Sequence, residues 1–341
     1  MIIQSIKNKI INGEALEVLK TMPSNYVHTI VTSPPYWGLR DYGKSDQLGL
    51  EDDYNDYVQR LTDIFSEARR VLRNDGTLWL NLGDSYIGNM SRASNNGRAG
   101  FGNEREGIFN RSSAGLKNKD LAGIPWRVAF ALQAEGWYLR QDIIWSKSNP
   151  MPESVSDRCT KSHEHMFLLS KSSNYYFDAY AIREKTSNKR DVWTIAAGNY
   201  KGAHFATFPQ DLIIPCIQAG TSEQGCCSLC GLSQVRALEM TEEYKNLKGK
   251  GWKGKDDFQD TGMRGVGGLP TIEQKYRTVG WEKNCECDAD ASPCIVMDIF
   301  MGSGTTAYVA KRLGRRYLGI ELNEEYVEIA NNRLKQEELF V

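Results

Sequence analysis

Two short motifs, far apart in the chain, carry residue types that could act on a ligand. In the first, residues 32–37, two consecutive prolines follow a run of β-branched and apolar residues. Because prolines fix the backbone, the side chain of Ser33 and the carbonyl of Pro34 can present two acceptors to one place, while Tyr36 offers an aromatic face. Such a site suits an aromatic amine. A structural turn with a core tyrosine is the alternative interpretation of the same residues, Ser33, Pro34, Pro35 and Tyr36.

The exocyclic amino group of a nucleobase is an amine that needs this help. Its lone pair is conjugated into the ring, which makes the nitrogen a poor nucleophile. Two acceptors that hold its hydrogens would favour the pyramidal nitrogen needed for attack, and stacking on Tyr36 would hold the ring in place.

The second motif is glycine-rich and follows a predicted strand at residues 295–299. Residues 298–306 read DIFMGSGTT and open a predicted helix, and glycines at such a turn let a ligand approach the backbone. Glu321 ends the next predicted strand, where an acidic side chain can accept hydrogen bonds from both hydroxyls of a ribose. We therefore expect an adenosine-containing cofactor. A dinucleotide-binding dehydrogenase turn and a packing turn without a ligand are the alternatives.

The eight cysteines are not expected to form disulfides, because the chain begins without a secretory apolar segment. A CxxC pair and a CxC pair are separated by 54 residues, and four thiolates can close a tetrahedral zinc site. Such a site would be structural, because it leaves no open position for catalysis. Reduced surface thiols are the alternative, and Cys226 is a competing ligand. The expected zinc ligands are Cys227, Cys230, Cys285 and Cys287.

The elements that must position these motifs alternate between strand and helix, which indicates an α/β sheet. Strands are predicted at residues 27–31, 77–82, 137–145, 166–169, 295–299 and 317–321. Helices are predicted at residues 51–73, at 124–135, at 305–313 and from 323 onward. The first of them is expected to end at Asn74, Asp75 and Gly76.

Two stretches fit no regular element. Residues 88–118 form a basic loop rich in Gly, Ser, Asn and Arg, and residues 226–290 read as an insertion. Five lysines lie between residues 245 and 255 of the insertion, a run that could neutralise phosphates or simply be a solvated loop. Since the net charge is -1, a polyanion partner would need such a local basic face.

The overall composition, 40% apolar and 25% charged, is typical of a globular protein. No stretch approaches the roughly 18 consecutive apolar residues of a membrane helix. We therefore expect no membrane partner and a cytoplasmic location.

The two motifs together resemble the signatures of the amino-group DNA methyltransferases that use S-adenosylmethionine. Those enzymes carry a (D/N/S)PP(Y/F) catalytic loop, which residues 33–36 match, and an FxGxG cofactor turn, which residues 300–304 match. The catalytic loop precedes the cofactor turn by more than 260 residues, an order similar to the β group of that family, in which the sheet halves are permuted. The resemblance covers most of the chain.

Two further segments extend the resemblance. Residues 145–165 are similar to the family's target-base region, and residues 204–209 are similar to a motif whose aromatic residue lies near the methionine end of the cofactor. The cofactor-binding residues that the resemblance implies are Phe208, Asp298, Phe300, Gly302, Ser303, Gly304, Thr305 and Glu321.

The implied fold is a Rossmann-like mixed seven-stranded sheet with permuted motif order and an inserted irregular segment. Residues 1–225 would form the catalytic half, including the basic loop and the target-base region. Residues 226–290 would be the insertion, for zinc and DNA recognition, and residues 291–341 the βαβ half of the same domain, which binds S-adenosylmethionine.

The implied activity is site-specific methylation of DNA. A flipped base would stack in the pocket and its amino nitrogen would attack the sulfonium methyl directly, so that positioning supplies much of the acceleration. Ser33 resembles the cytosine-N4 branch of the family, and adenine N6 is the alternative. RNA methylation and a nicotinamide dehydrogenase are less favoured, since hydride transfer has no use for the Ser-Pro-Pro-Tyr loop.

Methylation of cytosine C5 is disfavoured, because it requires a cysteine nucleophile. Cys216 and Cys294 both follow a proline and offer one superficially, but both are better interpreted as small core residues. The expected partner is double-stranded DNA. A cognate restriction nuclease is a candidate partner, and the oligomeric state stays open.

Overall fold

A central sheet of eight strands organises the protein, in the order β1-β12-β11-β2-β3-β5-β4-β6. This computed structural model describes residues 7–38, 47–87, 115–185, 187–198, 208–249 and 275–336. The sheet is mixed, because β5 is antiparallel to both of its neighbours and all other neighbouring pairs are parallel. The strands are β1 (Lys9–Asn12), β2 (Val27–Thr32), β3 (Leu72–Leu82), β4 (Tyr138–Lys147), β5 (His163–Ser170), β6 (Val192–Ile195), β11 (Ile295–Asp298) and β12 (Arg316–Glu321).

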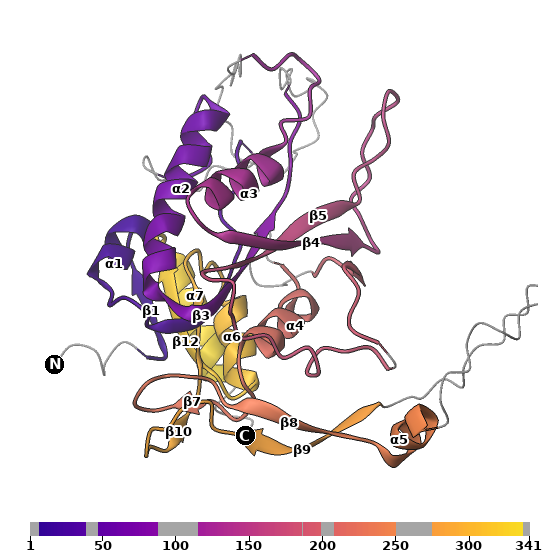
Figure 1. Ribbon diagram of the computed structural model, residues 1–341. Helices are drawn as coiled ribbons and strands as arrows, with labels where there is room; N and C mark the ends of the chain where they lie inside the picture. The colour runs from indigo at the N-terminus through magenta and orange to yellow at the C-terminus, as the bar shows by residue number, and fades with distance from the viewer. Residues whose placement is uncertain are drawn as a thin grey trace, which may run out of the picture.

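Helices cover both faces of the sheet (Figure 1), as the predicted alternation of strand and helix requires. One face packs against α1 (Ala15–Thr21), α2 (Tyr54–Val71) and α3 (Ile124–Ala134). The other face packs against α4 (Gln210–Gly220) and α6 (Thr305–Arg312), with α7 (Glu324–Gln336) beside α6 and β1. The expected mixed α/β architecture is confirmed, with eight strands in place of seven.

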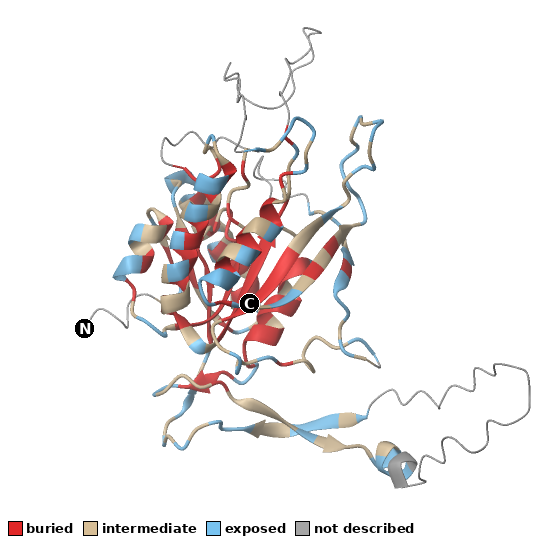
Figure 2. Ribbon diagram, turned by 45° about the horizontal axis from the view of Figure 1, so that its top comes forward, coloured by how far each residue is buried: buried red, intermediate tan, exposed pale blue. Residues whose placement is uncertain are grey.

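The central strands are buried on both faces because helices cover both faces. All six residues of β2 are buried. In β3, Leu78 and Leu80 belong to the core beneath α2, whereas Trp79 between them belongs to the core beneath α4. Figure 2 shows the buried residues concentrated in the sheet and in the helix faces turned toward it.

Helix α2 differs from its prediction at the end. Asp53 caps its start by accepting a hydrogen bond from the backbone of Asn55, but the helix ends at Val71, before the predicted Asn-Asp-Gly stop. Residues 73–76 lie instead within β3, where the pairing with β2 shifts its register. Two polar side chains in this segment pair with each other, because Arg73 Nε donates to Asp75 Oδ1 at 2.9 Å.

The insertion contains more regular structure than expected. Strands β8 (Val235–Met240) and β9 (Tyr276–Glu282) form an antiparallel ribbon that projects from the sheet (Figure 1), and α5 (Glu242–Gly249) follows β8. At its base, β7 (Cys226–Cys227) pairs with β10 (Ala291–Ser292).

Arg236 anchors the ribbon to the body of the protein. Its Nη2 donates to Asp178 Oδ2 at 2.9 Å, and its guanidinium lies 4.3 Å from the centre of the Trp281 ring. Because Asp178 is buried, this ion pair ties β8 to the loop that follows β5.

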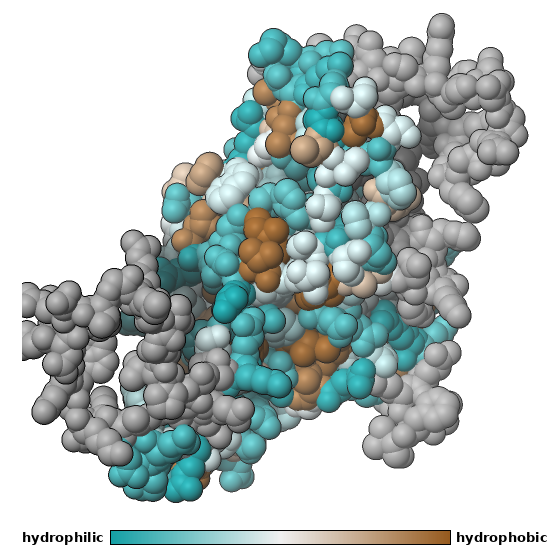
Figure 3. All heavy atoms as spheres, turned by 90° about the vertical axis from the view of Figure 1, so that its right-hand side faces the viewer, coloured by the Kyte–Doolittle hydropathy of each residue, from teal (hydrophilic) through white to brown (hydrophobic). Residues whose placement is uncertain are grey.

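No helix among the described residues is long and apolar enough to cross a membrane. On the face shown in Figure 3, apolar side chains lie in separate small patches among hydrophilic ones.

Candidate active site

Three adjacent parallel strands bring the two sequence motifs to one edge of the sheet. The catalytic loop follows β2, the glycine-rich turn follows β11, and Glu321 ends β12. In the sheet β11 lies between β2 and β12, and all three run in the same direction. The carboxyl ends of parallel strands are the usual place for a ligand in an open α/β sheet. The structure therefore places Ser33 and Gly302 at the same edge.

Asp298 organises the junction between the two motifs. Thr32 Oγ1 donates to its Oδ1 at 2.6 Å, the backbone of Phe300 donates to the same oxygen at 3.0 Å, and Thr306 Oγ1 donates to Oδ2 at 2.7 Å. The side chain is buried, and burial raises the pKa of this carboxyl to about 6. Both oxygens of this buried side chain accept internal bonds, so Asp298 holds the end of β2 and the glycine-rich turn together.

The glycine-rich turn depends on backbone conformations that glycine favours. Gly302 and Gly304 have φ values of 52° and 80°. A Cβ on Gly304 would lie 2.8 Å from Cβ of Ala330, so this glycine also allows α6 to approach α7. A Cβ on Gly302 would meet nothing within 4 Å. The turn is therefore closed on the Gly304 side and open at Gly302, where a ligand could approach the backbone.

The Glu321 carboxylate holds this turn by accepting hydrogen bonds from backbone N–H groups. Its Oε2 accepts from the Gly302 backbone at 2.7 Å and its Oε1 accepts from the Asn323 backbone at 2.8 Å. Burial raises the pKa of the Glu321 carboxyl. Each carboxylate oxygen has a second lone pair, so the group can still accept from the hydroxyls of a ribose.

The other predicted cofactor residues occupy different surroundings. Ser303 and Thr305 are buried and face α7, where Arg333 Nη1 donates to Thr305 Oγ1 at 3.0 Å. Phe300 packs against the core beneath α2, whereas Phe208 packs against the core beneath α4. Residues 204–207 of the same predicted motif lie outside the described residues.

The catalytic loop is held from several sides. Tyr57 Oη donates to the Pro35 carbonyl at 2.9 Å, and Trp37 is buried with its Nε1 donating to the Glu51 carbonyl. Pro34 is buried as well. A Cβ on Gly83, just after β3, would lie 2.6 Å from Cε2 of Tyr36, so only glycine leaves room for the ring in this position.

Tyr36 makes contacts that the sequence motif does not reveal. Its hydroxyl lies 2.7 Å from Glu164 Oε2 on β5 and 3.0 Å from Asn81 Oδ1 on β3. Lys147 on β4 forms an ion pair with the other oxygen of Glu164. Burial, followed by the charge of Glu164, raises the pKa of Tyr36 well above its ordinary value, so Tyr36 keeps its proton. The sequence places Lys147 and Glu164 in a target-base segment but gives no sign of their contact with the loop.

His165, the third residue of β5, is a hydrogen-bonded histidine. Its Nδ1 lies 3.0 Å from Asp142 Oδ1 on β4. This contact joins β5 to β4.

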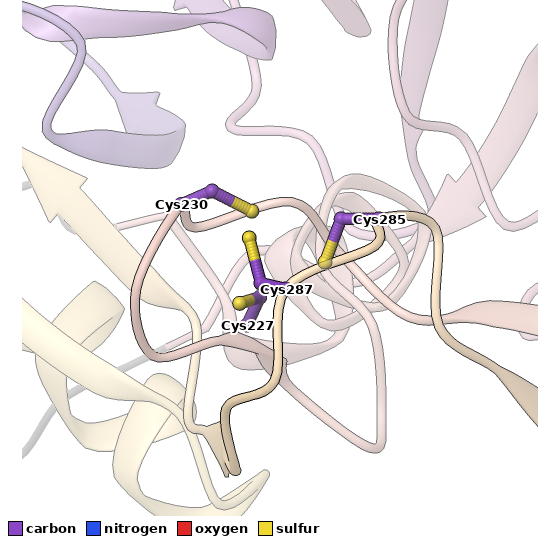
Figure 4. A group of neighbouring side chains, drawn as sticks. All are labelled: Cys227, Cys230, Cys285 and Cys287. Carbon is purple, nitrogen blue, oxygen red and sulfur yellow. The ribbon is translucent and has the colours of Figure 1, made fainter.

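The four cysteines of the predicted zinc site come together. Their sulfur atoms all lie within 4.8 Å of one another, and Figure 4 shows the side chains turned toward a common space. One pair comes from β7 and the turn after it, and the other comes from the segment between β9 and β10. Gly231 in that turn has a φ of 76°, and a Cβ there would lie 2.3 Å from Nη1 of Arg73. The four ligands are Cys227, Cys230, Cys285 and Cys287.

A second group, His28 with Cys226 and Cys294, also clusters within 4.8 Å, but its histidine has no lone pair to offer. The backbone of Ile295 donates to His28 Nδ1 at 3.0 Å, so Nε2 carries the proton that it shares with the Gly231 carbonyl, also at 3.0 Å. His28 therefore links the cysteine turn to β11. Cys216 and Cys294 are fully buried, as expected of core residues.

The cysteine cluster lies at the edge of the sheet opposite to the catalytic loop. His28 is near the start of β2 and Cys294 directly precedes β11, whereas Ser33 and Asp298 lie at or beyond the other ends of these strands. Figure 1 shows β7, β8, β9 and β10 together on one side of the body. Any metal held there could support the strands but could not touch the catalytic loop.

The basic segments predicted to contact DNA are described only in part. Most of the loop at 88–118, and residues 250–255 of the lysine run, lie outside the described residues. Lys245, within α5, donates to Glu242 Oε1 at 2.7 Å, so its charge is balanced locally.

Comparison with known proteins agrees with the motifs. A family model described as DNA methylase, of the N6 and N4 type, matches residues 27–227 and 294–332. The type II methyltransferase M.Cfr9I of Citrobacter freundii is 42% identical over 334 residues, which cover 96% of this chain and 87% of that protein. M.SmaI of Serratia marcescens is 40% identical over 338 residues, covering 96% of this chain and 90% of that protein.

Solved structures share the fold at low identity. The PvuII DNA methyltransferase, named as cytosine-N4-specific, is similar with a TM-score of 0.59 at 17% identity, covering 96% of this chain and 86% of that one. A Thermus thermophilus protein, solved as a complex with S-adenosyl-L-methionine, is similar with a TM-score of 0.54 at 20% identity, covering 97% of this chain and 94% of that one. From its match to the family model and its identity to these relatives, the chain belongs to the N6/N4 family of DNA methyltransferases.

Proposed function

We propose that this enzyme transfers a methyl group from S-adenosylmethionine to the N4 amino group of a cytosine flipped out of double-stranded DNA. The observation that carries the proposal is the junction of the two motifs, where Thr32 beside the catalytic loop donates to Asp298 beside the glycine-rich turn at 2.6 Å. This bond sets an acceptor loop and an open glycine turn next to each other, as transfer between two bound molecules requires.

The donor would lie over the glycine-rich turn. Gly302 leaves its backbone open, and Glu321, fixed by two backbone N–H groups, would accept hydrogen bonds from the ribose hydroxyls. When bound, S-adenosylmethionine supplies a methyl group already activated by its sulfonium. The remaining residues of the turn shape it, since Asp298 and Thr305 have internal partners.

The base would lie against the catalytic loop. Ser33 and the Pro34 carbonyl would accept the amino hydrogens, and the Tyr36 ring, packed against Gly83 on one side, would stack on the base. Extrusion of the base costs a few kcal/mol, which contacts in the site must offset. No cysteine is needed, and Cys216 and Cys294 are buried in the core.

The preference for cytosine N4 over adenine N6 rests on Ser33 at the first position of the loop. Adenine N6 remains the second candidate, because the same acceptors can hold either amino group. Membership of the DNA methylase family favours both over a dehydrogenase, and it favours DNA over RNA. M.Cfr9I and M.SmaI are named type II methyltransferases, so a restriction nuclease with the same recognition site is the expected biological partner.

A direct test is transfer of a labelled methyl group to duplex DNA, followed by digestion to nucleosides and mass measurement. We expect N4-methylcytosine. N6-methyladenine would replace the cytosine assignment with the adenine one, and no labelled nucleoside would overturn both. The Ser33→Ala and Tyr36→Ala variants should lose most of the rate at saturating donor, and full rate in both would contradict the assignment of this loop.

We also propose that the cysteine cluster binds one structural zinc ion. Zinc bonded to four sulfurs at about 2.3 Å separates them by about 3.8 Å, and the sulfurs of Cys227, Cys230, Cys285 and Cys287 lie within 4.8 Å of one another. We propose further that residues 1–225 and 291–341 form one catalytic domain. The insertion, residues 226–290, would be a module attached to this domain at the edge of the sheet opposite to the catalytic loop.

A further inference from the structure

A chain of contacts joins Ser33 to a carboxylate on another strand. Ser33 Oγ lies 3.4 Å from Tyr36 Oη, which lies 2.7 Å from Glu164 Oε2 on β5. Lys147, on the neighbouring strand β4, pairs with Glu164 Oε1. The link to Ser33 is the longest of these contacts. The three strands that carry the loop and its two charged partners thus meet at the catalytic edge of the sheet.

The protons in this chain have a definite direction. A carboxylate only accepts, so Tyr36 must donate its proton to Glu164. The oxygen of Tyr36 then faces Ser33 as an acceptor, and the Ser33 hydroxyl donates to it. With its own proton committed, Ser33 Oγ presents only lone pairs to any other group. That is the form needed to accept a hydrogen from an amino group.

Asn81 is the competing acceptor for the Tyr36 proton. Its Oδ1 lies 3.0 Å from Tyr36 Oη, but Glu164 is closer and charged, which makes the stronger hydrogen bond. The Asn81 amide is fixed in this orientation, because its Nδ2 donates to the His165 carbonyl at 3.1 Å and to Glu164 Oε2 at 3.3 Å. Asn81 therefore supports Glu164 in place.

The burial of the pair explains why a lysine accompanies the glutamate. The side chains of Lys147 and Glu164 are 22% and 12% exposed. A carboxylate so far removed from water is strongly disfavoured unless it is paired and hydrogen-bonded. Lys147 provides the opposite charge, and its ammonium also lies 4.8 Å from the centre of the Trp145 ring.

We propose that Glu164, held by Lys147, is a positioning residue that orders the protons of Tyr36 and Ser33 so that Ser33 accepts a hydrogen of the target amino group. This inference rests on the proposed function. As the nitrogen–carbon bond forms, the carbon–sulfur bond breaks, its electron pair remains on sulfur, and the nitrogen becomes positive. Its hydrogens then donate more strongly, so an acceptor oriented in advance stabilises the transition state more than the ground state. The extra proton leaves the nitrogen for water afterwards.

The test is a double-mutant cycle of Glu164→Gln and Tyr36→Phe, measured as the single-turnover rate of methyl transfer at saturating donor and DNA. Glutamine keeps the size of the side chain but can present an amide N–H to Tyr36, and phenylalanine keeps the ring but removes the proton relay. Each single variant should be about 10- to 100-fold slower, as for the loss of a hydrogen bond to a charged group. The double variant should be no slower than the slower single variant, and donor affinity should be unchanged.

Asp75→Asn is the matched control. Arg73 and Asp75 form a pair of similar burial, 13% and 23% exposed, at the opposite edge of the sheet. This variant should lower the melting temperature but not the single-turnover rate of the folded enzyme, whereas Glu164→Asp should recover part of the rate lost in Glu164→Gln.

Three results would overturn the inference. They are wild-type rate in Glu164→Gln, losses that multiply in the double variant, and an equal slowing in the Asp75→Asn control. Each is distinct from failure of the proposed function, in which the wild-type enzyme itself would place no methyl group on a base amino nitrogen.

Discussion

Thr32 and Asp298 are 266 residues apart in the sequence, yet Thr32 Oγ1 donates to Asp298 Oδ1 across 2.6 Å. The bond joins the last residue of β2 to the last residue of β11, two neighbouring parallel strands. The catalytic loop begins one residue after Thr32, and the glycine-rich turn begins directly after Asp298. A single buried carboxylate therefore controls how the two motifs are placed relative to each other.

This carboxylate should make the stability of the protein depend on pH. Burial raises the pKa of Asp298 from 3.8 to about 6, so the folded protein binds this proton more tightly than the unfolded chain does. The contribution of Asp298 to stability is therefore complete below about pH 4 and is lost as the pH rises through about 6, a change of about 3 kcal/mol.

Asp298→Asn removes this titration. The free energies of unfolding of the wild type and the variant should be measured by urea denaturation. Their difference should shift by about 2.5 kcal/mol between pH 4 and pH 7 in favour of the variant. A difference that stays constant across this range would show that Asp298 does not titrate there.

Glu321→Ala should weaken donor binding. The change removes the acceptor of two backbone N–H groups and the expected partner of the ribose hydroxyls. Loss of hydrogen bonds to a charged group corresponds to about 1.5–3 kcal/mol, or roughly 10- to 100-fold in affinity for S-adenosylmethionine, measured by calorimetry without DNA. Glu321→Gln, which keeps one acceptor oxygen, should lose less. Equal affinity in Glu321→Ala and the wild type would remove Glu321 from the donor site.

Gly83→Ala should slow transfer without weakening donor binding. The new Cβ would lie 2.6 Å from Cε2 of Tyr36, so the ring must move from the position that the loop gives it. We expect at least a tenfold loss in single-turnover rate, because small misplacements of reacting groups lower the rate strongly. The control is Gly280→Ala in β9, where a Cβ meets nothing within 4 Å, and it should be neutral in both rate and stability.

Removal of the proposed zinc should destabilise the protein without changing the chemistry. Purified protein should contain one zinc ion per chain by mass spectrometry, and Cys285→Ser should lose the metal and lower the melting temperature. The rate per folded molecule should persist, because the cluster lies at the edge opposite to Ser33. Cys159→Ser, at an exposed cysteine outside the cluster, should keep both metal and stability. Metal-free wild-type protein of equal stability would contradict the zinc site.

Local patterns in the sequence predict much of the fold. The strand–turn–helix around the glycine-rich motif appears as β11, its turn and α6 with nearly the predicted bounds, because apolar runs and glycine punctuate the chain there. The CxxC and CxC pairs also come together, since thiol spacing is a strong signal for a shared site. The family resemblance is confirmed by the comparisons.

Long-range contacts account for what the sequence does not predict. The bond between Tyr36 and Glu164 links residues 128 positions apart, and it exists only because β5 runs antiparallel beside β3. The order of strands likewise leaves no local trace, so the short edge strands β1 and β6 and the ribbon of β8 and β9 were not predicted. The early end of α2 depends on the shifted pairing between β2 and β3, which local helix periodicity does not encode.

The first strand of the sheet lies against the last one along the chain. Lys9 to Asn12 of β1 pair in parallel with residues of β12, and Ile10 shares a small apolar cluster with Leu334 near the end of α7. A peptide linker could therefore join the start of β1 to the end of α7. New chain ends could then be made in a loop elsewhere, with every strand pairing preserved. The arrangement of motifs along a gene can thus change by circular permutation while the catalytic architecture does not.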